Sequence, residues 1–546
     1  MKALSKQKVL LTTAVLATSM ILTACGTNTK TASDDPTALD HATTPNTYPI
    51  ETDVTLRYWM QLPPQVSAQA TSMNDIELAR YLEDETGIKV SFEHPVAGQE
   101  AAAFNILQAS GDAPDIIEWS WAEYPGGPQG AINDKLIIPL DSYIEKASPN
   151  LKALLEKNPE WKKSITSSEG HIYEYPFIKD NPTLLTYMTY VVRQDLLDKA
   201  GLSTPVTFED WETMLYKFKD MGISAPISLK LNNFYLQYCS PFTSKFGIVG
   251  GWYQKNGKVQ FGPAQEEFGD YIKMLKRWYE DGILDREFAD ITPNRITAGV
   301  TNGNIGALYC SVGGELGNYL SAISENSGIK LTPVTIPVER AGETPMWGQK
   351  DYPVVDCAAI SYDSKHKELA ARFLDYGYSE KGHLTYNFGR ENDSFTYQDN
   401  SLGTHMPTYT ANVTDPAVNG GLTLAQGIAK YARAYSNGPF VQDLNYLYQY
   451  YTRPEQQSAF DVWGSDALDY KLPKNLIYEG DEESRFKDIM TAVDTYREES
   501  LAKFVAGKAS IGELDNYFAQ LKSLGIDEAI SIQQKAYDRY LSLNAD

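Results

Sequence analysis

Cysteine is scarce in this chain. Only four cysteines occur in 546 residues, and none of them stands in a CxxC spacing. The six histidines are scattered and form no HxH or HExxH pattern; they are His41, His94, His171, His366, His383 and His405. Zinc sites need such clustered ligands, so we expect no metal and no other cofactor.

Two further features are missing. No P-loop pattern occurs, so we do not expect this chain to hydrolyse ATP. If its function requires an ATPase, that ATPase must be a separate subunit. Positive charge is also in deficit, with 48 Lys and Arg against 71 Asp and Glu and a net charge of −23. Such a surface should be repelled by anionic polymers, which argues against a nucleic-acid partner.

The length suits two or three domains, and no apolar run after residue 24 could cross a bilayer.

The N-terminus carries a distinct pattern. Three lysines precede an apolar run over 9–24, which ends in Leu22-Thr23-Ala24-Cys25 followed by Gly26. This resembles a bacterial lipoprotein signal peptide with its lipobox. The resemblance implies removal of residues 1–24 and acyl chains such as palmitate on Cys25, which would hold the protein at the extracellular face of the cell membrane. An uncleaved anchor helix is disfavoured because the run is short and stops at Cys25.

The mature chain would then begin with a tether. Loss of residues 1–24 removes three lysines and no acidic residue, which takes the net charge from −23 to −26. Residues 25–53 are rich in Thr, Ser, Asn, Asp and Pro without hydrophobic periodicity, so we expect a flexible tether and a folded body from Val54. With Cys25 lipidated, three cysteines remain: Cys239, Cys310 and Cys357. Their apolar and aromatic neighbours predict buried thiols, although one disulfide with one free thiol also fits.

The folded body starts with alternating strand and helix patterns. Residues 54–60 and 88–92 alternate like strands, and Leu78, Tyr81 and Leu82 between them have helical spacing before Gly87. A helix over 100–108 and a strand over 115–118 follow. These βαβ units predict a parallel sheet covered by helices.

A second α/β region begins near Thr186. Residues 189–192 form a strand pattern that leads into a helix, and Thr207 with Asp210 marks the start of another. Trp211 and Trp278 lie on apolar helical stripes and are predicted core residues. Near the C-terminus, Ser510 and Glu513 form a capping box before two further helices.

One segment resembles a family signature. Ser110-Gly111-Asp112-Ala113-Pro114-Asp115-Ile116 is similar to the S/A-G-x-x-P-D-[IV] signature of extracellular solute-binding proteins of family 1, the oligosaccharide type. Further segments resemble that family in the expected order, at 138–141, 172–176, 193–198, 279–285, 303–307, 504–511 and 536–540. One departure is Glu169-Gly170-His171, which replaces the usual Asp-Gly-Lys but keeps a turn.

The resemblance implies an architecture and a role. It implies an α/β, two-lobe, periplasmic-binding-protein-like fold with a hinge between the lobes. Lobe 1 would span 54–180 and lobe 2 would span 181–351, while 352–546 would return to lobe 1 and end in helices shared between the lobes. The protein would capture an oligosaccharide by lobe closure and deliver it, as a monomer without catalytic residues, to the permease subunits of an ABC importer.

Sugar sites combine aromatic platforms with polar side chains, and this chain has 9 Trp and 36 Tyr. The loop after the 115–118 strand offers Trp119, Trp121 and Glu123 at a sheet edge where α/β proteins bind ligands. Trp59 and Gln61 leave the first strand at the same edge. From the second lobe and the strands that return from it we expect Tyr309, Ser311, Glu315, Trp347 and Trp463.

Two other functions and one further pair of contacts are also considered. A surface glycoside hydrolase would need a carboxylate pair such as Glu118 with Glu123 across a cleft. An oligopeptide-binding lipoprotein would suit the chain length, but the 110–116 signature favours the sugar-binding family. Arg193 and Arg390 could contact an acidic sugar, and we expect instead that both form structural ion pairs.

Overall fold

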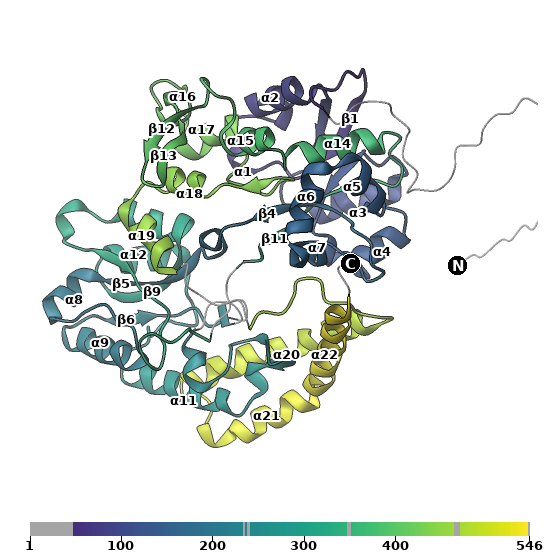
Figure 1. The fold of residues 1–546 in the computed structure, drawn as a ribbon. Helices are drawn as coiled ribbons and strands as arrows, with labels where there is room; N and C mark the ends of the chain where they lie inside the picture. The colour runs from purple at the N-terminus through teal and green to yellow at the C-terminus, as the bar shows by residue number, and fades with distance from the viewer. Residues whose placement is uncertain (1–46, 233–234, 237–240, 347–350, 464–469, 544–546) are drawn as a thin grey trace, which may run out of the picture.

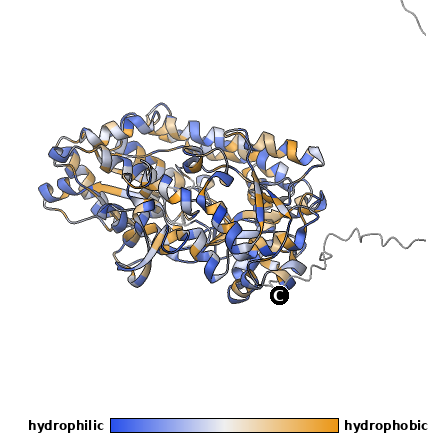
Figure 2. Cartoon of the chain, turned by 90° about the horizontal axis from the view of Figure 1, so that it is seen from above, coloured by the Kyte–Doolittle hydropathy of each residue, from blue (hydrophilic) through white to orange (hydrophobic). Residues whose placement is uncertain are grey.

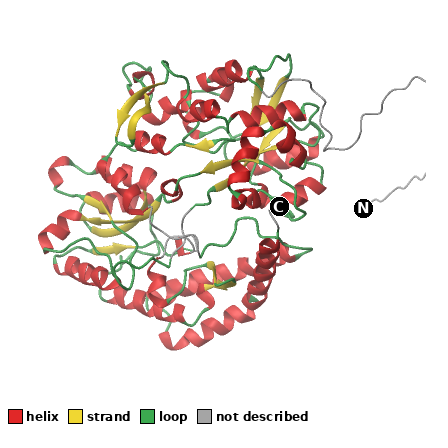
Figure 3. Ribbon diagram, in the orientation of Figure 1, coloured by secondary structure: helices red, strands yellow, loops and turns green. Residues whose placement is uncertain are grey.

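The computed structural model describes residues 47–232, 235–236, 241–346, 351–463 and 470–543. Within them the chain forms two lobes, each built around one mixed sheet and covered by helices (Figures 1 and 3). The predicted signal peptide, Cys25 and most of the tether lie outside the described residues. No helix among those residues is long and apolar enough to span a membrane.

The first sheet has six strands in the order β14-β4-β11-β3-β1-β2. Their bounds are β1 Thr55–Trp59, β2 Lys89–Glu93, β3 Ile116–Glu118, β4 Tyr175–Lys179, β11 Val354–Ile360 and β14 Val441–Gln442. β1 runs parallel to β2 and β3, as predicted, but β11 runs antiparallel to both β3 and β4. The prediction of a wholly parallel sheet is therefore wrong, because β11 enters the sheet from the other lobe, in the opposite direction.

The second sheet has the order β10-β5-β9-β6. Its strands are β5 Met188–Arg193, β6 Ala225–Ser228, β9 Ile305–Ser311 and β10 Leu331–Pro333. β9 is parallel to β6, while β5 is antiparallel to β9 and β10. Two hairpins stand apart from the sheets, β7 Trp252–Lys255 with β8 Lys258–Phe261 and β12 Phe395–Asn400 with β13 Gly403–Tyr409.

Amphipathic helices cover both sheets, and in Figure 2 most of them alternate between hydrophilic and hydrophobic residues along their length. Around the first sheet lie α1 Pro64–Ser67, α2 Glu77–Thr86, α3 Glu100–Ser110, α4 Gly127–Asn133, α5 Asp141–Ala147, α6 Pro149–Lys157, α7 Pro159–Ser164, α14 Lys367–Tyr376 and α15 Glu380–Phe388. Around the second lie α8 Gln194–Ala200, α9 Phe208–Asp220, α11 Glu267–Glu280, α12 Pro293–Thr301 and α13 Asn318–Ala322.

The remaining helices follow the return to the first sheet. They are α16 Ala411–Thr414, α17 Leu424–Tyr431, α18 Leu444–Tyr450, α19 Pro454–Trp463, α20 Glu482–Val505, α21 Leu514–Ser523 and α22 Ile526–Ser542. α19 packs against β10, and α20 packs against α11, so the chain crosses between the lobes again after β14. Apolar side chains of α20 to α22 share one core with Trp211 and Trp278 of the second lobe. The exact domain bounds stay a prediction.

Local signals in the sequence are confirmed at several helix ends. Gly87 ends α2 and Gly111 ends α3, both in the left-handed conformation. Thr207 with Asp210 and Ser510 with Glu513 form the predicted capping boxes. Asp115 of the family signature accepts hydrogen bonds from the Arg57 backbone N–H and the Ser364 hydroxyl, which ties β1 to the chain beyond β11.

The structure also confirms predictions about buried cysteine and tryptophan side chains and about two arginine ion pairs. Cys310 and Cys357 are free, buried thiols, and Cys239 lies outside the described residues. Trp211 and Trp278 are buried as predicted. The predicted ion pairs form between Arg193 and Asp195 at 2.7 Å and between Arg390 and Asp84 at 2.8 Å.

The folded body begins earlier than predicted. The Tyr48 hydroxyl donates to the Arg372 carbonyl, and the Ile50 N–H donates to the Thr86 carbonyl at 2.7 Å. Ile50 is part of the first lobe's apolar core. The prediction of a tether up to residue 53 is thus wrong for these residues, because two isolated apolar side chains in a polar segment carry no periodicity that the sequence could reveal.

Candidate functional site

A cavity of about 490 Å³ lies at one edge of the first sheet. β1 ends there at Trp59 and β3 ends there at Glu118, because the two strands are parallel and in register. β11 enters the sheet from the second lobe at this same edge, so the cavity faces the second lobe. Its lining comprises Trp59, Gln61, Pro63, Pro64, Gln65, Glu100, Glu118, Trp119, Ser120, Asp356, Cys357, Arg433, Tyr435, Ser436 and Asn437.

Aromatic rings form one wall of the cavity. Phe104 of α3 stacks on Trp119 with ring centroids 4.0 Å apart and an interplanar angle of 5°. Trp59 packs against both rings, at 5.9 Å from Trp119 and 6.0 Å from Phe104. Phe104 thus covers one face of the half-buried Trp119 indole and holds it in place. Trp119 also lines the cavity, so part of its indole can meet a flat apolar surface such as the C–H face of a sugar ring.

A buried ion pair lies beside this wall. Arg433 donates from both terminal nitrogens to the Glu118 carboxylate, at 2.8 and 2.6 Å, and the Tyr58 hydroxyl donates to the same group. Burial disfavours the charged form of Arg433, but Glu118 more than compensates, so the pKa of Arg433 stands well above its usual value. The pair therefore presents a fixed, nearly neutral polar group to the cavity.

A second charged group lies deeper. Asp356 forms an ion pair with Lys474 and accepts from the Ala122 backbone N–H at 3.1 Å. Glu174 nearby accepts from the Cys357 N–H at 2.7 Å, and burial together with the Asp356 charge raises the pKa of Glu174 well above its usual range. Lys474 comes from the chain just before α20. The floor of the cavity is therefore connected to the segment that leads to the C-terminal helices.

The structure brings three of the predicted first-lobe residues together. Trp59, Gln61 and Trp119 all line the cavity, and the Gln61 amide donates to Glu100 at 3.0 Å. Trp121 does not line it: its side chain is fully buried and its indole N–H donates to the Cys357 carbonyl at 3.1 Å. Glu123 is exposed on the short helix Trp121–Glu123, outside the cavity lining.

The predicted second-lobe residues are placed differently. Tyr309 is buried and its hydroxyl donates to the Met188 carbonyl at 3.3 Å, while Trp463 is buried in a core beside β10. Ser311 and Glu315 cap each other at the end of β9, and Glu315 also forms an ion pair with Lys230 at 2.7 Å. These side chains support the second lobe itself. Trp347 lies outside the described residues.

One side of the cavity consists of residues that no sequence pattern predicts. Arg433, Tyr435, Ser436 and Asn437 lie between α17 and β14 and contribute to the lining. No strand pattern precedes them, and they reach the cavity only because β14 joins the sheet beside β4. Their only local signal is a polar stretch between an apolar helix and Pro439, which is too common to identify a site.

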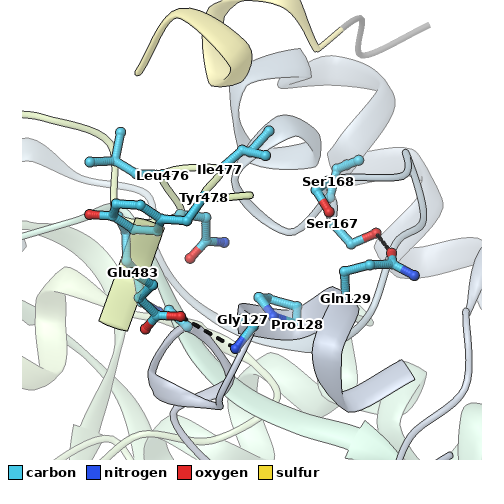
Figure 4. A pocket seen from close by; sticks show the side chains of 14 residues that line it. Gly127, Pro128, Gln129, Ser167, Ser168, Leu476, Ile477, Tyr478 and Glu483 are labelled. Carbon is cyan, nitrogen blue, oxygen red and sulfur yellow. Dashed lines mark hydrogen bonds between the residues drawn. The ribbon is translucent and has the colours of Figure 1, made fainter. Parts of the chain in front are cut away.

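A smaller pocket of about 100 Å³ lies elsewhere, between α4 and the segment before α20 (Figure 4). Ser167 donates to Gln129 at 2.7 Å on one side, and Glu483 accepts from the Gly126 N–H at 3.3 Å on the other. Its size suits a few water molecules rather than a ligand. The described residues contain no cluster of His, Cys, Asp and Glu that could hold a metal ion.

Two α/β lobes, several crossing segments and a polar cavity with an aromatic wall define a two-lobe ligand-binding protein. The family model of the bacterial extracellular solute-binding proteins matches residues 66–383, and the chain belongs to that family.

Known relatives and structures agree with this assignment. The fructooligosaccharide ABC transporter substrate-binding protein FusA of Streptococcus pneumoniae is 25% identical, over 99% of this chain and 98% of its own. Two solved structures share the fold. The alginate-binding protein AlgQ2 has a TM-score of 0.64 at 21% identity and covers 89% of this chain and 99% of its own. An HMO-binding, ABC-transporter-associated protein of Bifidobacterium longum infantis has a TM-score of 0.67 at 18% identity, with coverage of 89% and 99%.

Proposed function

We propose that this protein is the substrate-binding component of an ABC importer and that it captures an oligosaccharide in the cavity of the first lobe. The observation that carries the proposal is the Trp119 platform, held by Phe104 beside fixed polar groups. This combination suits a ligand with flat C–H faces and a rim of hydroxyls. The similarity to FusA along nearly the whole chain supports the transport role.

In this proposal Trp59, Gln61 and Trp119 contact the sugar from the first lobe, and the second lobe closes over it. Trp347 remains a proposed contact on the opposite face of the sugar. The lipobox resemblance supports acylation of Cys25, which would keep the receptor at the extracellular face of the membrane close to its permease. Hydrolysis of ATP would fall to a separate subunit.

The carboxylates of the cavity do not favour catalysis. Of the three carboxylates that line the cavity, Glu118 is held by Arg433 and Tyr58, and Asp356 is paired with Lys474, which leaves only Glu100 without a cation among the described residues. Glu123 lies outside the lining. A glycosidase needs two carboxyl groups that face each other across the bond. We therefore propose binding without chemical change of the sugar.

The test is a titration of the purified protein with a panel of oligosaccharides, followed by tryptophan fluorescence and calorimetry. Saturable binding with recovery of the unchanged sugar is the expected result. Release of shorter sugars would indicate a hydrolase, and competition by peptides for the same site would indicate a peptide receptor. Absence of binding by folded protein to every sugar would overturn the proposal.

A further inference from the structure

The segment 433–437 brings buried polar atoms with incomplete hydrogen bonding to the cavity. Arg433 Nε is buried without a hydrogen-bond partner among the described residues, and the buried hydroxyls of Tyr435 and Ser436 have no partner there beyond each other. All three residues line the cavity. Buried polar groups are nearly always paired in folded proteins, and an unpaired one is destabilising. Their incomplete hydrogen bonding in the wall of the cavity points to a ligand that completes it.

Hydroxyl groups are the natural partners of these atoms. Tyr and Ser hydroxyls can each donate and accept, as a sugar hydroxyl can, while Arg Nε only donates. Burial raises the pKa of Tyr435 to about 12, so its hydroxyl keeps its proton at neutral pH. The Asn437 side chain adds an exposed amide at the rim. This segment therefore offers a set of donors and acceptors, and its one charge, that of Arg433, is balanced by Glu118.

The charged residues of the cavity are unfavourable to an acidic ligand. Three carboxylates line it (Glu100, Glu118 and Asp356) against one guanidinium, that of Arg433. Both terminal nitrogens of Arg433 are bound to Glu118, and Lys474 is bound to Asp356, so neither cation can take a carboxylate in the usual two-point manner.

Glu100 adds an uncompensated negative charge. Its carboxylate accepts from the Gly98 N–H at 2.8 Å, and this hydrogen bond lowers its pKa, which keeps it ionised. Its side-chain partner, the Gln61 amide, is uncharged, so none of its partners among the described residues neutralises the charge. A uronic acid in this cavity would meet like charge, which disfavours binding.

Resting on the proposed function, we infer that the ligand is an uncharged oligosaccharide and that Tyr435, Ser436 and Arg433 Nε bind its hydroxyls.

The first experiment compares matched ligands. The tightest-binding oligosaccharide of the panel is oxidised at its primary alcohols to the uronate, and both forms are titrated into the purified protein. We expect the uronate to bind at least about tenfold more weakly, a difference of about 1.4 kcal/mol. Equal or tighter binding of the uronate would overturn the inference while leaving oligosaccharide binding intact. If no oligosaccharide of the panel binds to the folded protein, the proposed function itself is overturned.

The second experiment isolates the negative charge. Glu100→Gln removes the charge but keeps the side-chain shape, so it should reduce the difference between the neutral and oxidised sugar. The affinities for the neutral and the oxidised sugar are compared at low salt. If they differ as much in the variant as in the original protein, the charge of Glu100 does not select against acidic ligands, and the inference loses its electrostatic support.

The third experiment tests the contact segment. Tyr435→Phe and Ser436→Ala each remove one hydroxyl and should weaken the binding of the neutral sugar by about 2- to 10-fold, as expected for a single hydrogen bond. Tyr397→Phe makes the same change in the β12–β13 hairpin outside the cavity and should leave affinity unchanged. Unaltered affinity in both cavity variants, with their circular dichroism intact, would overturn the assignment of this segment.

Discussion

At the scale of single residues, the site depends on neighbours that hold its side chains in place. Trp119 is half-buried because Phe104 stacks on it and Trp59 packs against both rings. A stacked ring loses little conformational freedom when a ligand binds, which favours affinity. The neighbouring Trp121 has a structural role instead, since its indole is fully buried and its N–H donates to the Cys357 carbonyl.

Trp119→Ala should therefore weaken oligosaccharide binding by at least about tenfold, or about 1.4 kcal/mol, because the stacking surface is lost. Calorimetry with the best ligand of the panel measures the effect. Trp161→Ala removes a half-buried indole on α7, outside the cavity, and is the matched control. Similar affinities for the two variants would mean that Trp119 is not a platform.

Arg433 and Glu118 form a buried pair that should matter for stability. Arg433→Met leaves the Glu118 carboxylate without its main partner, and breaking a buried pair typically costs about 3–5 kcal/mol. The free energy of unfolding from urea denaturation is the measurement. Arg80→Met removes a half-exposed guanidinium from its pair with Glu77 and should cost about 1 kcal/mol or less. Equal losses in the two variants would contradict the buried character of the Arg433 pair.

At the scale of elements, helix ends position the strands that carry the site. Gly87 joins α2 to β2 in the left-handed conformation, and its backbone lies against Ile50. A Cβ atom at this position would come within 2.2 Å of the Ile50 carbonyl oxygen. The N-terminal segment is thus fixed to the first lobe by a close backbone approach that only glycine permits.

Gly87→Ala should destabilise the protein by more than the roughly 1–2 kcal/mol of left-handed strain, because a steric clash adds to it. Gly201→Ala is the matched control, since Gly201 also ends a helix at positive φ but has open space around its Cβ position. Thermal unfolding of both variants gives the comparison. A control that is destabilised as much as Gly87→Ala would show that the contact with Ile50 is unimportant.

At the scale of the whole molecule, several chain crossings connect the lobes, and the cavity faces the second lobe. The segments 180–187 and 334–353 join the two sheets, and the chain crosses again beyond β14. The last three helices share the core of the second lobe, yet Lys474 just before them binds Asp356 at the floor of the cavity. Closure of the lobes on a ligand would therefore move the C-terminal helices as well.

Saturating oligosaccharide should reduce the radius of gyration measured by small-angle X-ray scattering, because hinge closure brings the lobes together. Trp119→Ala under the same sugar concentration should show a smaller change, since fewer molecules are occupied. An unchanged radius of gyration at full occupancy would show that binding does not close the lobes.

Cys25→Ser should release the protein from the membrane and impair sugar uptake while the affinity for the sugar stays the same. The reason is that Cys25 is the proposed site of the lipid anchor and lies far along the sequence from every cavity residue. Cell fractionation, uptake assays and calorimetry measure the three quantities. Cys310→Ser is the matched control, since this free, buried thiol lies outside the lipobox and should leave anchoring unchanged. A loss of affinity in Cys25→Ser would contradict the separation of anchor and binding site.

Much of the local structure could be predicted from the sequence. Alternating apolar residues identified β1, β2 and β5, and glycines and capping residues located the ends of α2, α3 and α9. These signals are local, because caps and strand alternation depend on residues close together in the chain. Trp59, Gln61 and Trp119 could be predicted as neighbours because parallel strands end at the same edge of a sheet.

Only the tertiary structure decided the rest. β11 pairs antiparallel with β3, and Arg433 meets Glu118 across 315 residues of sequence. It also decided that Trp121, Tyr309 and Trp463 are buried while Tyr435 and Ser436 line the cavity. Residue types and local spacing determine which segments become strands and helices. The contacts between distant segments, which create the cavity and its incompletely paired polar atoms, arise only when those segments pack together.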